Sequence, residues 1–132
     1  MKKVFVNGCF DVLHVGHIRL LEFAKSHGDC LIVALDTDEK VKNAKGINRP
    51  FNNLETRKEV MSSIKYVDLV LDFSSDEELV TLLNIIKPDT RILGSDWEGK
   101  PIVGEGCVRD LKYFRRVNGF STTKILESSS GR

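Results

Sequence analysis

GCFDVLHVGH, residues 8–17, is the stretch that decides the fold of this 132-residue chain. The preceding segment KKVFVN, residues 2–7, predicts a short strand, and apolar residues then recur at helical spacing up to Gly28. The stretch therefore lies at a strand-to-helix junction. Because a helix start offers unpaired N–H groups and partial positive charge, we predict that this turn binds phosphate groups.

Two histidines in this turn are the first candidates for chemistry. His14 and His17 lie three residues apart, on one side of the first helical turn, and Gly16 would keep the space between them clear. Each ring can donate hydrogen bonds to phosphate oxygens, and a protonated ring can stabilise charge during nucleotidyl transfer. The alternatives are partly buried structural histidines, or half of a zinc site completed by Cys9 and Cys30, although no CxxC accompanies the pair.

Length and composition favour one small domain, which we place at residues 1–127, followed by a flexible tail at 128–132. The hydrophobic fraction is 41% and the formal net charge is +1, so the sequence predicts neither a nucleic-acid surface nor a membrane surface. Three cysteines form no paired framework, and the first residues lead into a strand without a signal peptide. We expect a cytoplasmic protein whose partners are small anions.

Short apolar runs alternate with helical patterns along the rest of the chain. The runs at residues 30–35, 69–73 and 91–93 predict strands buried on both faces. Helical patterns cover residues 54–64 and 76–87. This alternation predicts an α/β fold, a single-domain Rossmann-like parallel sheet with helices on both faces, which binds ligands at the carboxyl ends of its strands.

The helix boundaries carry specific signals. Asn52 or Asn53 would cap the helix at 54–64, Ser75 with Glu78 forms a capping-box pattern, and Pro88 would end the helix at 76–87.

A second helix start follows near the end of the chain. Ser121, Thr122 and Thr123 precede a short helical pattern at residues 124–127, and Arg116 and Gly119 stand just before them. Their hydroxyls and backbone N–H groups could bind further phosphates, whereas the simpler alternative is an N-cap after a turn.

On these motifs the chain resembles the HxGH nucleotidyltransferases, and among them the small cytidylyltransferases, over nearly its whole length. RVNGFSTT, residues 116–123, is similar to the family's second signature, RTxGxSTT. The resemblance implies the nucleotidyltransferase HxGH fold. It also implies that Arg116, Ser121 and Thr122 hold the nucleoside triphosphate, with Gly119 and Thr123 in the same segment.

Two loops carry further expectations from the resemblance. KGINRPFNNLETR, residues 45–57, is long enough for a mobile flap, in which Lys45 would reach the phosphates. Arg57 and Asp38 match substrate-binding positions of the family, although Lys45 could be merely solvated and Arg57 could form a surface ion pair.

The loop LGSDWEGK, residues 93–100, follows the fourth predicted strand. Its Gly94, Asp96 and Trp97 suit recognition of the base or ribose, and the alternative for Trp97 is an anchor in the core.

Two subgroups of the family compete for the substrates. GSDWEGK and the arginine of RVNGFSTT resemble the glycerol-3-phosphate cytidylyltransferases, and we expect CTP and glycerol 3-phosphate to give CDP-glycerol and pyrophosphate. NGCFDVLH and KGINRPFNNLETR resemble instead the adenylyltransferases that make ADP-heptose. The alternative is therefore an adenylyltransferase acting on a sugar phosphate such as heptose 1-phosphate. An alternative of another class is a non-catalytic nucleotide-binding module.

Two departures weaken the glycerol-phosphate assignment. Lys65 stands where those enzymes tend to have arginine, and the acidic SSDEEL, residues 74–79, stands where they offer lysine.

The resemblance implies direct in-line attack of the acceptor phosphate on the α-phosphorus, without a protein nucleophile. His14 and His17 would contact the α-phosphate and the bridging oxygen, and Lys45 and Arg116 would balance the charge of the triphosphate. Ser121 and Thr122 would bind the β- and γ-phosphates. The turn residues would contact the nucleotide: Gly8, Cys9, Phe10 and Asp11.

The resemblance also implies a magnesium ion and a homodimer. Mg²⁺ is expected because it lowers the repulsion between two polyanions, but no acidic cluster in the sequence locates it.

Overall fold

The computed structural model describes residues 1–115, which form five parallel strands, four α-helices and one short 3₁₀ helix. The strands are β1 (Lys3–Gly8), β2 (Cys30–Asp36), β3 (Leu69–Phe73), β4 (Thr90–Gly94) and β5 (Asp110–Phe114). The helices are α1 (Val15–Lys25), α2 (Asp38–Lys45), α3 (Leu54–Ser62), α4 (Asp76–Ile86) and the 3₁₀ helix η1 (Ser95–Trp97). The sheet order β3-β2-β1-β4-β5 confirms the predicted Rossmann-like architecture.

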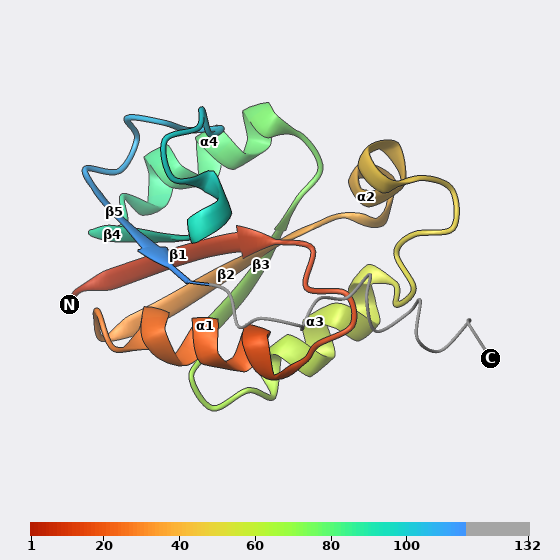
Figure 1. Ribbon diagram of the computed structural model, residues 1–132, viewed down its shortest axis with the longest axis horizontal. Helices are drawn as coiled ribbons and strands as arrows, with labels where there is room; N and C mark the ends of the chain where they lie inside the picture. Colours follow the sequence, from red (N-terminus) through yellow and green to blue (C-terminus); the bar gives the residue numbers. More distant parts are fainter. Residues whose placement is uncertain (116–132) are drawn as a thin grey trace.

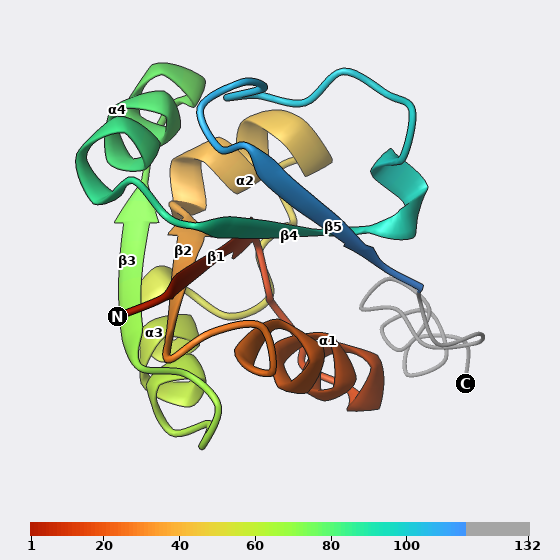
Figure 2. The same ribbon diagram turned by 90° about the vertical axis from the view of Figure 1, so that its left-hand side faces the viewer.

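The sheet is covered on both faces. Helices α1 and α3 lie on one face, and α4 and α2 lie on the other (Figures 1 and 2). Because side chains alternate along a strand, Val4 and Val6 of β1 pack in the cluster that includes Leu21 of α1, whereas Phe5 packs in the cluster that includes Leu79 of α4. Both predicted core faces are therefore present.

The order in which strands are added to the sheet reverses at the central strand β1. The chain first builds outward through β2 and β3, and then returns to add β4 and β5 on the opposite side of β1. A crevice opens at the carboxyl ends of the strands where the order reverses, which is the usual ligand site of such sheets. The turn at residues 8–17 leaves β1 at this crevice.

The predicted helix starts agree with the structure, but α3 ends at Ser62 and α4 at Ile86, before the predicted residues 64 and 87, and one cap differs. Asn53 caps α3, with its side chain accepting from the N–H of Thr56 at 2.8 Å. Ser75 caps α4 by accepting from the N–H of Glu78 at 3.1 Å, but the Glu78 carboxylate accepts from the Ser74 hydroxyl at 3.0 Å. The Glu78 carboxylate thus accepts from the Ser74 hydroxyl, whereas the capping-box pattern predicts that it accepts from the backbone N–H of Ser75.

Three elements were not predicted from the sequence: α2, β5 and the short 3₁₀ helix η1. Helix α2 buries Val41 alone and shows no apolar stripe, so periodicity could not reveal it. Its signals are the cap at Thr37, acidic residues in its first turn and lysines in its last turn, which suit the helix dipole. Strand β5 is a half-buried edge strand, DLKYF, in which charged residues interrupt the apolar run.

Candidate active site

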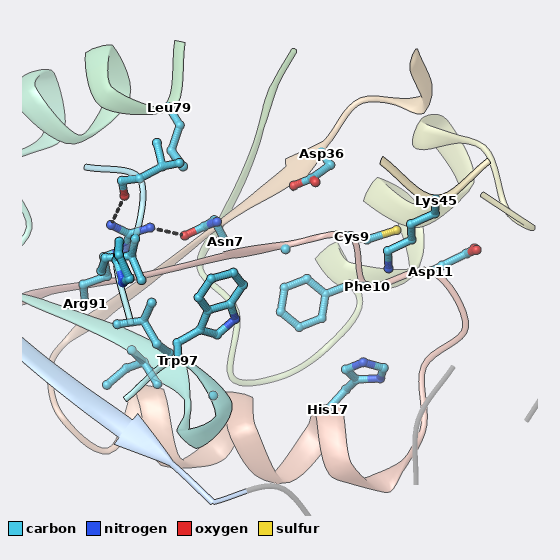
Figure 3. Close-up of a pocket in the computed structure, with 17 residues that line it drawn as sticks. Asn7, Cys9, Phe10, Asp11, His17, Asp36, Lys45, Leu79, Arg91 and Trp97 are labelled. Carbon is cyan, nitrogen blue, oxygen red and sulfur yellow. Dashed lines mark hydrogen bonds between the residues drawn. The ribbon is translucent and has the colours of Figure 1, made fainter. Parts of the chain in front are cut away.

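A cavity of about 480 Å³ lies at the carboxyl ends of β1 and β4 (Figure 3). Its wall combines the turn after β1, the end of β4 with the loop that follows, and single side chains from α1, β2, α2 and α4. The lining residues are 7–11, His17, Asp36, Lys45, Leu79, 91–94, Trp97 and 101–103. The structure thus brings the predicted turn, Lys45 and the loop after β4 to one cavity.

His14 and His17 hold each other in place at the start of α1. His14 is the N-cap, and its Nδ1 accepts from the N–H of Gly16 at 3.0 Å. The Nδ1 of His17 accepts in turn from the N–H of His14 at 3.2 Å, and the ring centroids are 3.9 Å apart. Because Nδ1 accepts in both rings, the neutral ring carries its proton on Nε2, the nitrogen that can donate to a phosphate oxygen. His17 lines the cavity, and His14 caps the helix beside it.

The turn between β1 and α1 is tightly folded around Phe10. Phe10 adopts a left-handed backbone conformation with φ of 49°, which is uncommon for a residue other than glycine. Its buried ring packs edge-on against His17 with centroids 5.4 Å apart. A Cβ at Gly8 would lie 3.0 Å from the same ring, so glycine allows this close packing. The turn therefore helps to position the His17 ring through its contact with Phe10, which also lines the cavity.

Asp11 fastens the flap to this turn. Its buried carboxylate accepts from the N–H groups of Phe51 and Asn52, at 2.6 and 2.7 Å, and Arg49 lies 3.6 Å away. Asp11 lines the cavity, but its carboxylate oxygens are directed to the backbone of residues 51 and 52, and its predicted contact with the nucleotide stays a prediction. The segment expected to be one mobile flap is divided, because Lys45 ends α2 and residues 46–53 form the remaining loop.

Arg57 is fully buried and has a different surrounding from the one expected of a substrate ligand. Its guanidinium donates to the backbone carbonyls of Asn52, Cys9 and Asp36 at 2.7–3.0 Å, and to the Asp38 carboxylate at 2.7 Å. Neither Arg57 nor Asp38 belongs to the cavity wall formed by residues 1–115. The pair ties together the turn after β1, the end of β2 and the start of α2 and α3.

The charged end of the cavity contains Cys9, Asp36 and Lys45. Burial raises the pKa of the Asp36 carboxyl, and the cations Lys40, Lys45 and Arg57 oppose this shift. Burial likewise raises the pKa of the Cys9 thiol, against the same influence of Lys45 and Arg57. Lys45 is therefore close enough to act on both groups. A thiol with a raised pKa stays protonated near neutral pH and is a poor nucleophile.

Asn7, Asp36 and Arg91 line the cavity but were missed by the sequence analysis. Arg91 stands inside an apolar strand, where nothing in the pattern distinguishes an internal arginine from an edge residue. Asn7 was placed at the end of the predicted strand and in the segment NGCFDVLH, without a role in the site. Whether these side chains reach the cavity depends on the face of the sheet on which each one lies, and the sequence pattern does not predict that face.

The loop after β4 brings an aromatic side chain to the cavity. Trp97 of η1 is half-exposed and lines the cavity together with Gly94 and Phe10 (Figure 3). Asp96 is exposed beside it on the same short helix. The predicted role of these residues in base or ribose recognition stays a prediction.

The second phosphate segment lies outside the described residues 1–115. This applies to Arg116, Gly119, Ser121, Thr122 and Thr123, and to the tail at 128–132. Within residues 1–115, no group of three His, Cys, Asp or Glu side chains could hold a metal ion. The helices of this part of the chain also lack the length and apolar character that a membrane crossing requires.

Comparisons with known proteins agree with this geometry. A family model described as cytidylyltransferase-like matches residues 5–128. The chain is 45% identical over 130 residues to the bifunctional protein HldE of Sulfurimonas denitrificans, and 44% identical over 126 residues to that of Aliarcobacter butzleri. These alignments cover 98% and 96% of this chain but 27% and 26% of the relatives. The chain thus spans about a quarter of the length of these curated relatives.

Two solved structures are similar in fold. The lipopolysaccharide core biosynthesis protein from Thermoplasma volcanium superposes with a TM-score of 0.75 at 26% identity, covering 89% of this chain and 99% of that protein. Pantothenate synthetase from Thermus thermophilus superposes with a TM-score of 0.62 at 15% identity, covering 89% of this chain and 56% of the other, which shows a shared fold alone.

Proposed function

Because the chain belongs to the cytidylyltransferase-like family of the nucleotidyltransferase superfamily, we propose that it transfers a nucleotidyl group from a nucleoside triphosphate to a phosphorylated acceptor, releasing pyrophosphate. One observation carries this proposal. His14 and His17 are locked at the start of α1 with Nδ1 accepting, beside a cavity that also receives Lys45. The groups that we propose to bind phosphate are thus held in place by hydrogen bonds within the protein.

For the substrates, we propose ATP and a sugar phosphate such as heptose 1-phosphate. The HldE relatives favour this alternative over CTP and glycerol 3-phosphate. The likeness to a lipopolysaccharide core biosynthesis protein supports a sugar acceptor as well. The expectation of CTP rested on GSDWEGK and Arg116, whereas the turn and flap segments resembled the ADP-heptose enzymes and are the better guide.

The proposed reaction is one in-line displacement. An oxygen of the acceptor phosphate forms a bond to the α-phosphorus of ATP, while the bond from that phosphorus to the pyrophosphate oxygen breaks. The Nε2–H groups of His14 and His17 would donate to the α-phosphate and bridging oxygens, and Lys45 would balance the negative charge. Arg116, Ser121 and Thr122 are proposed to hold the remaining phosphates.

Magnesium remains an expectation for the nucleotide itself. We propose that Mg²⁺ enters with the triphosphate, where it would lower the repulsion between the two polyanions.

Pyrophosphate release tests the proposal. The purified chain with magnesium would be assayed with ATP or CTP, each paired with heptose 1-phosphate or glycerol 3-phosphate. We expect release with ATP and the sugar phosphate, and a loss of about 10²–10³-fold in kcat for His17→Ala, as for removal of one preorganised donor. His27→Ala, at the other end of α1, is the matched control.

The other outcomes contradict parts of the proposal separately. Release with CTP and glycerol 3-phosphate alone would restore the first expectation. Binding of nucleotide without release in any combination would favour a non-catalytic nucleotide-binding module. Unchanged turnover in H17A would remove the assigned role of the histidines.

A further inference from the structure

Three polar residues that line the cavity lie on the same face of the sheet. Phe5, Ile32 and Ala34 pack in the cluster on the α4 face, so Asn7 and Asp36, two residues further along β1 and β2, face the same way. Ile92 packs in the α1-face cluster, and its neighbour Arg91 therefore faces α4.

The register brings these residues close to one another. Asn7 pairs with Ala34, two residues before Asp36, and Arg91 pairs with Phe5, two residues before Asn7. The side chains are thus neighbours across β2, β1 and β4.

Arg91 orients Asn7. Arg91 is 2% exposed, and its Nη2 donates to the Asn7 Oδ1 at 2.9 Å while its Nη1 donates to the carbonyl of Val103 at 2.7 Å. A guanidinium cannot accept a hydrogen bond, so the amide oxygen of Asn7 must point toward Arg91 and its NH₂ group away from it. Figure 3 shows Arg91 at one end of the cavity and Lys45 at the other, with Asn7 between them.

The surroundings of Arg91 fit this positioning role. It takes part in none of the salt bridges of residues 1–115, its buried Nε has no hydrogen-bond partner there, and burial lowers its pKa. Burying a guanidinium without a carboxylate partner is costly, and stability alone gives no reason to place one beside a cavity.

The cavity between Asn7 and Lys45 has the chemistry of a sugar site. The Asn7 NH₂ group is a donor and the Asp36 carboxylate is an acceptor, a combination that suits hydroxyl groups. Leu79, Ile102 and Val103 add apolar surface on the same side, against which the C–H groups of a sugar can pack. Lys45, near Asp36, would face the phosphate end of the same molecule.

We propose that Asn7 and Asp36 form a subsite on the α4 face that binds the hydroxyl groups of the acceptor sugar phosphate, and that Arg91 is the positioning residue for Asn7. This inference rests on the proposed function and names how that site selects its acceptor. The nucleotide contacts the other part of the cavity, around His17 and Trp97.

Asn7→Asp is the sharpest test. Aspartate keeps an oxygen for Arg91 but removes the NH₂ donors and adds a second carboxylate near Asp36. We expect the KM for the sugar phosphate to rise about tenfold or more, while the KM for ATP stays within about twofold. Asn84→Asp makes the same change on the exposed side of α4 and should leave both values unchanged.

Arg91→Met tests the positioning role. The Asn7 amide is then released, and we expect the same selective rise in the acceptor KM. The double variant N7D/R91M should be no worse than the more affected single variant, because both substitutions remove one interaction. Thermal unfolding of R91M reports on folding, and N7D carries the test where R91M does not fold.

A sugar phosphate that lacks one hydroxyl group tests whether Asn7 binds that hydroxyl. If Asn7 binds that hydroxyl, the deoxy sugar phosphate should react more slowly with the wild type and show no further loss with N7D. Wild-type turnover with an unchanged acceptor KM in N7D would overturn this inference and leave the proposed function intact. Absence of wild-type turnover with every sugar phosphate would overturn the proposed function itself.

Discussion

Arg57 shows how one buried side chain can organise a site without lining it. Its guanidinium satisfies three backbone carbonyls and the Asp38 carboxylate, joining segments that are distant in the sequence. We expect Arg57→Met to lower the free energy of unfolding by about 2–4 kcal/mol, because the buried acceptors lose their donor. Urea denaturation measures this loss. Arg57→Lys, which keeps the charge but not the fork of donors, should recover part of it.

A stability of R57M within about 0.5 kcal/mol of the wild type would show that water replaces the guanidinium at this position.

The histidines and the buried arginines differ in how far the sequence predicts them. His14 and His17 could be placed because their spacing, the preceding strand and the following helix all act within a few residues. Arg57 and Arg91 owe their roles to partners that are distant in sequence, such as Cys9 for Arg57 and Asn7 for Arg91. Sequence spacing carries no information on such contacts, and a surface ion pair for Arg57 was therefore as plausible as the clamp that is observed.

At the scale of elements, the Asp11 carboxylate is one of the groups that hold the loop at residues 46–53 to the turn after β1, together with the Asn52 side chain, which donates to the Asp11 carbonyl at 3.2 Å. Asp11 accepts from the N–H groups of Phe51 and Asn52. In Asp11→Asn the NH₂ group replaces one acceptor oxygen, so one of these N–H groups loses its partner. We expect the amide hydrogen that loses its partner, that of residue 51 or 52, to exchange about tenfold faster or more in D11N.

Asp29→Asn is the matched control for D11N, since Asp29 accepts from the N–H of Lys2 at the other end of the sheet. Equal protection of residues 51 and 52 in wild type and D11N would show that other contacts hold the loop.

Helices α2 and α4 illustrate why elements differ in predictability. The α4 pattern was clear because Leu79 and Leu83 are buried at helical spacing. Helix α2 lies at the rim of the site and buries one residue, so its stability depends on its cap and on charges at its ends. Elements that carry functional groups at an edge bury little apolar surface, and for that reason hydrophobic periodicity misses them.

At the scale of the whole molecule, the fold class followed from the sequence because burial on both faces imposes continuous apolar strands. The outer strand β5 and the exact wall of the cavity did not follow, since both depend on how the chain returns across the sheet.

A carboxylate at the amino end of the sheet is stabilised in its charged form. Hydrogen bonds from Lys25 and from the N–H of Leu31 hold the pKa of Asp68 below its ordinary value of 3.8.

This depressed pKa predicts a dependence of stability on pH. The contribution of Asp68 is fully present above its unfolded-state pKa and is lost as the pH falls through the lower folded-state pKa. The difference in free energy of unfolding between wild type and Asp68→Asn should therefore be present at neutral pH and shrink below about pH 4. Denaturation at a series of pH values measures it, with Glu59→Gln on the exposed side of α3 as control. A difference that stays constant down to strongly acidic pH would contradict the prediction.

The alternation of side chains along β1 has a consequence for how such a protein can change. Val6 packs in the cluster with α1, the helix that presents the histidines, whereas Asn7 faces α4 and lines the cavity. Under the proposed function, neighbouring residues of one strand would therefore affect separate properties, the transfer chemistry and the choice of acceptor. If Asn7, Asp36 and Arg91 select the acceptor as proposed, substitutions at these positions would change the acceptor while the packing of Val6 beneath α1 stays as it is.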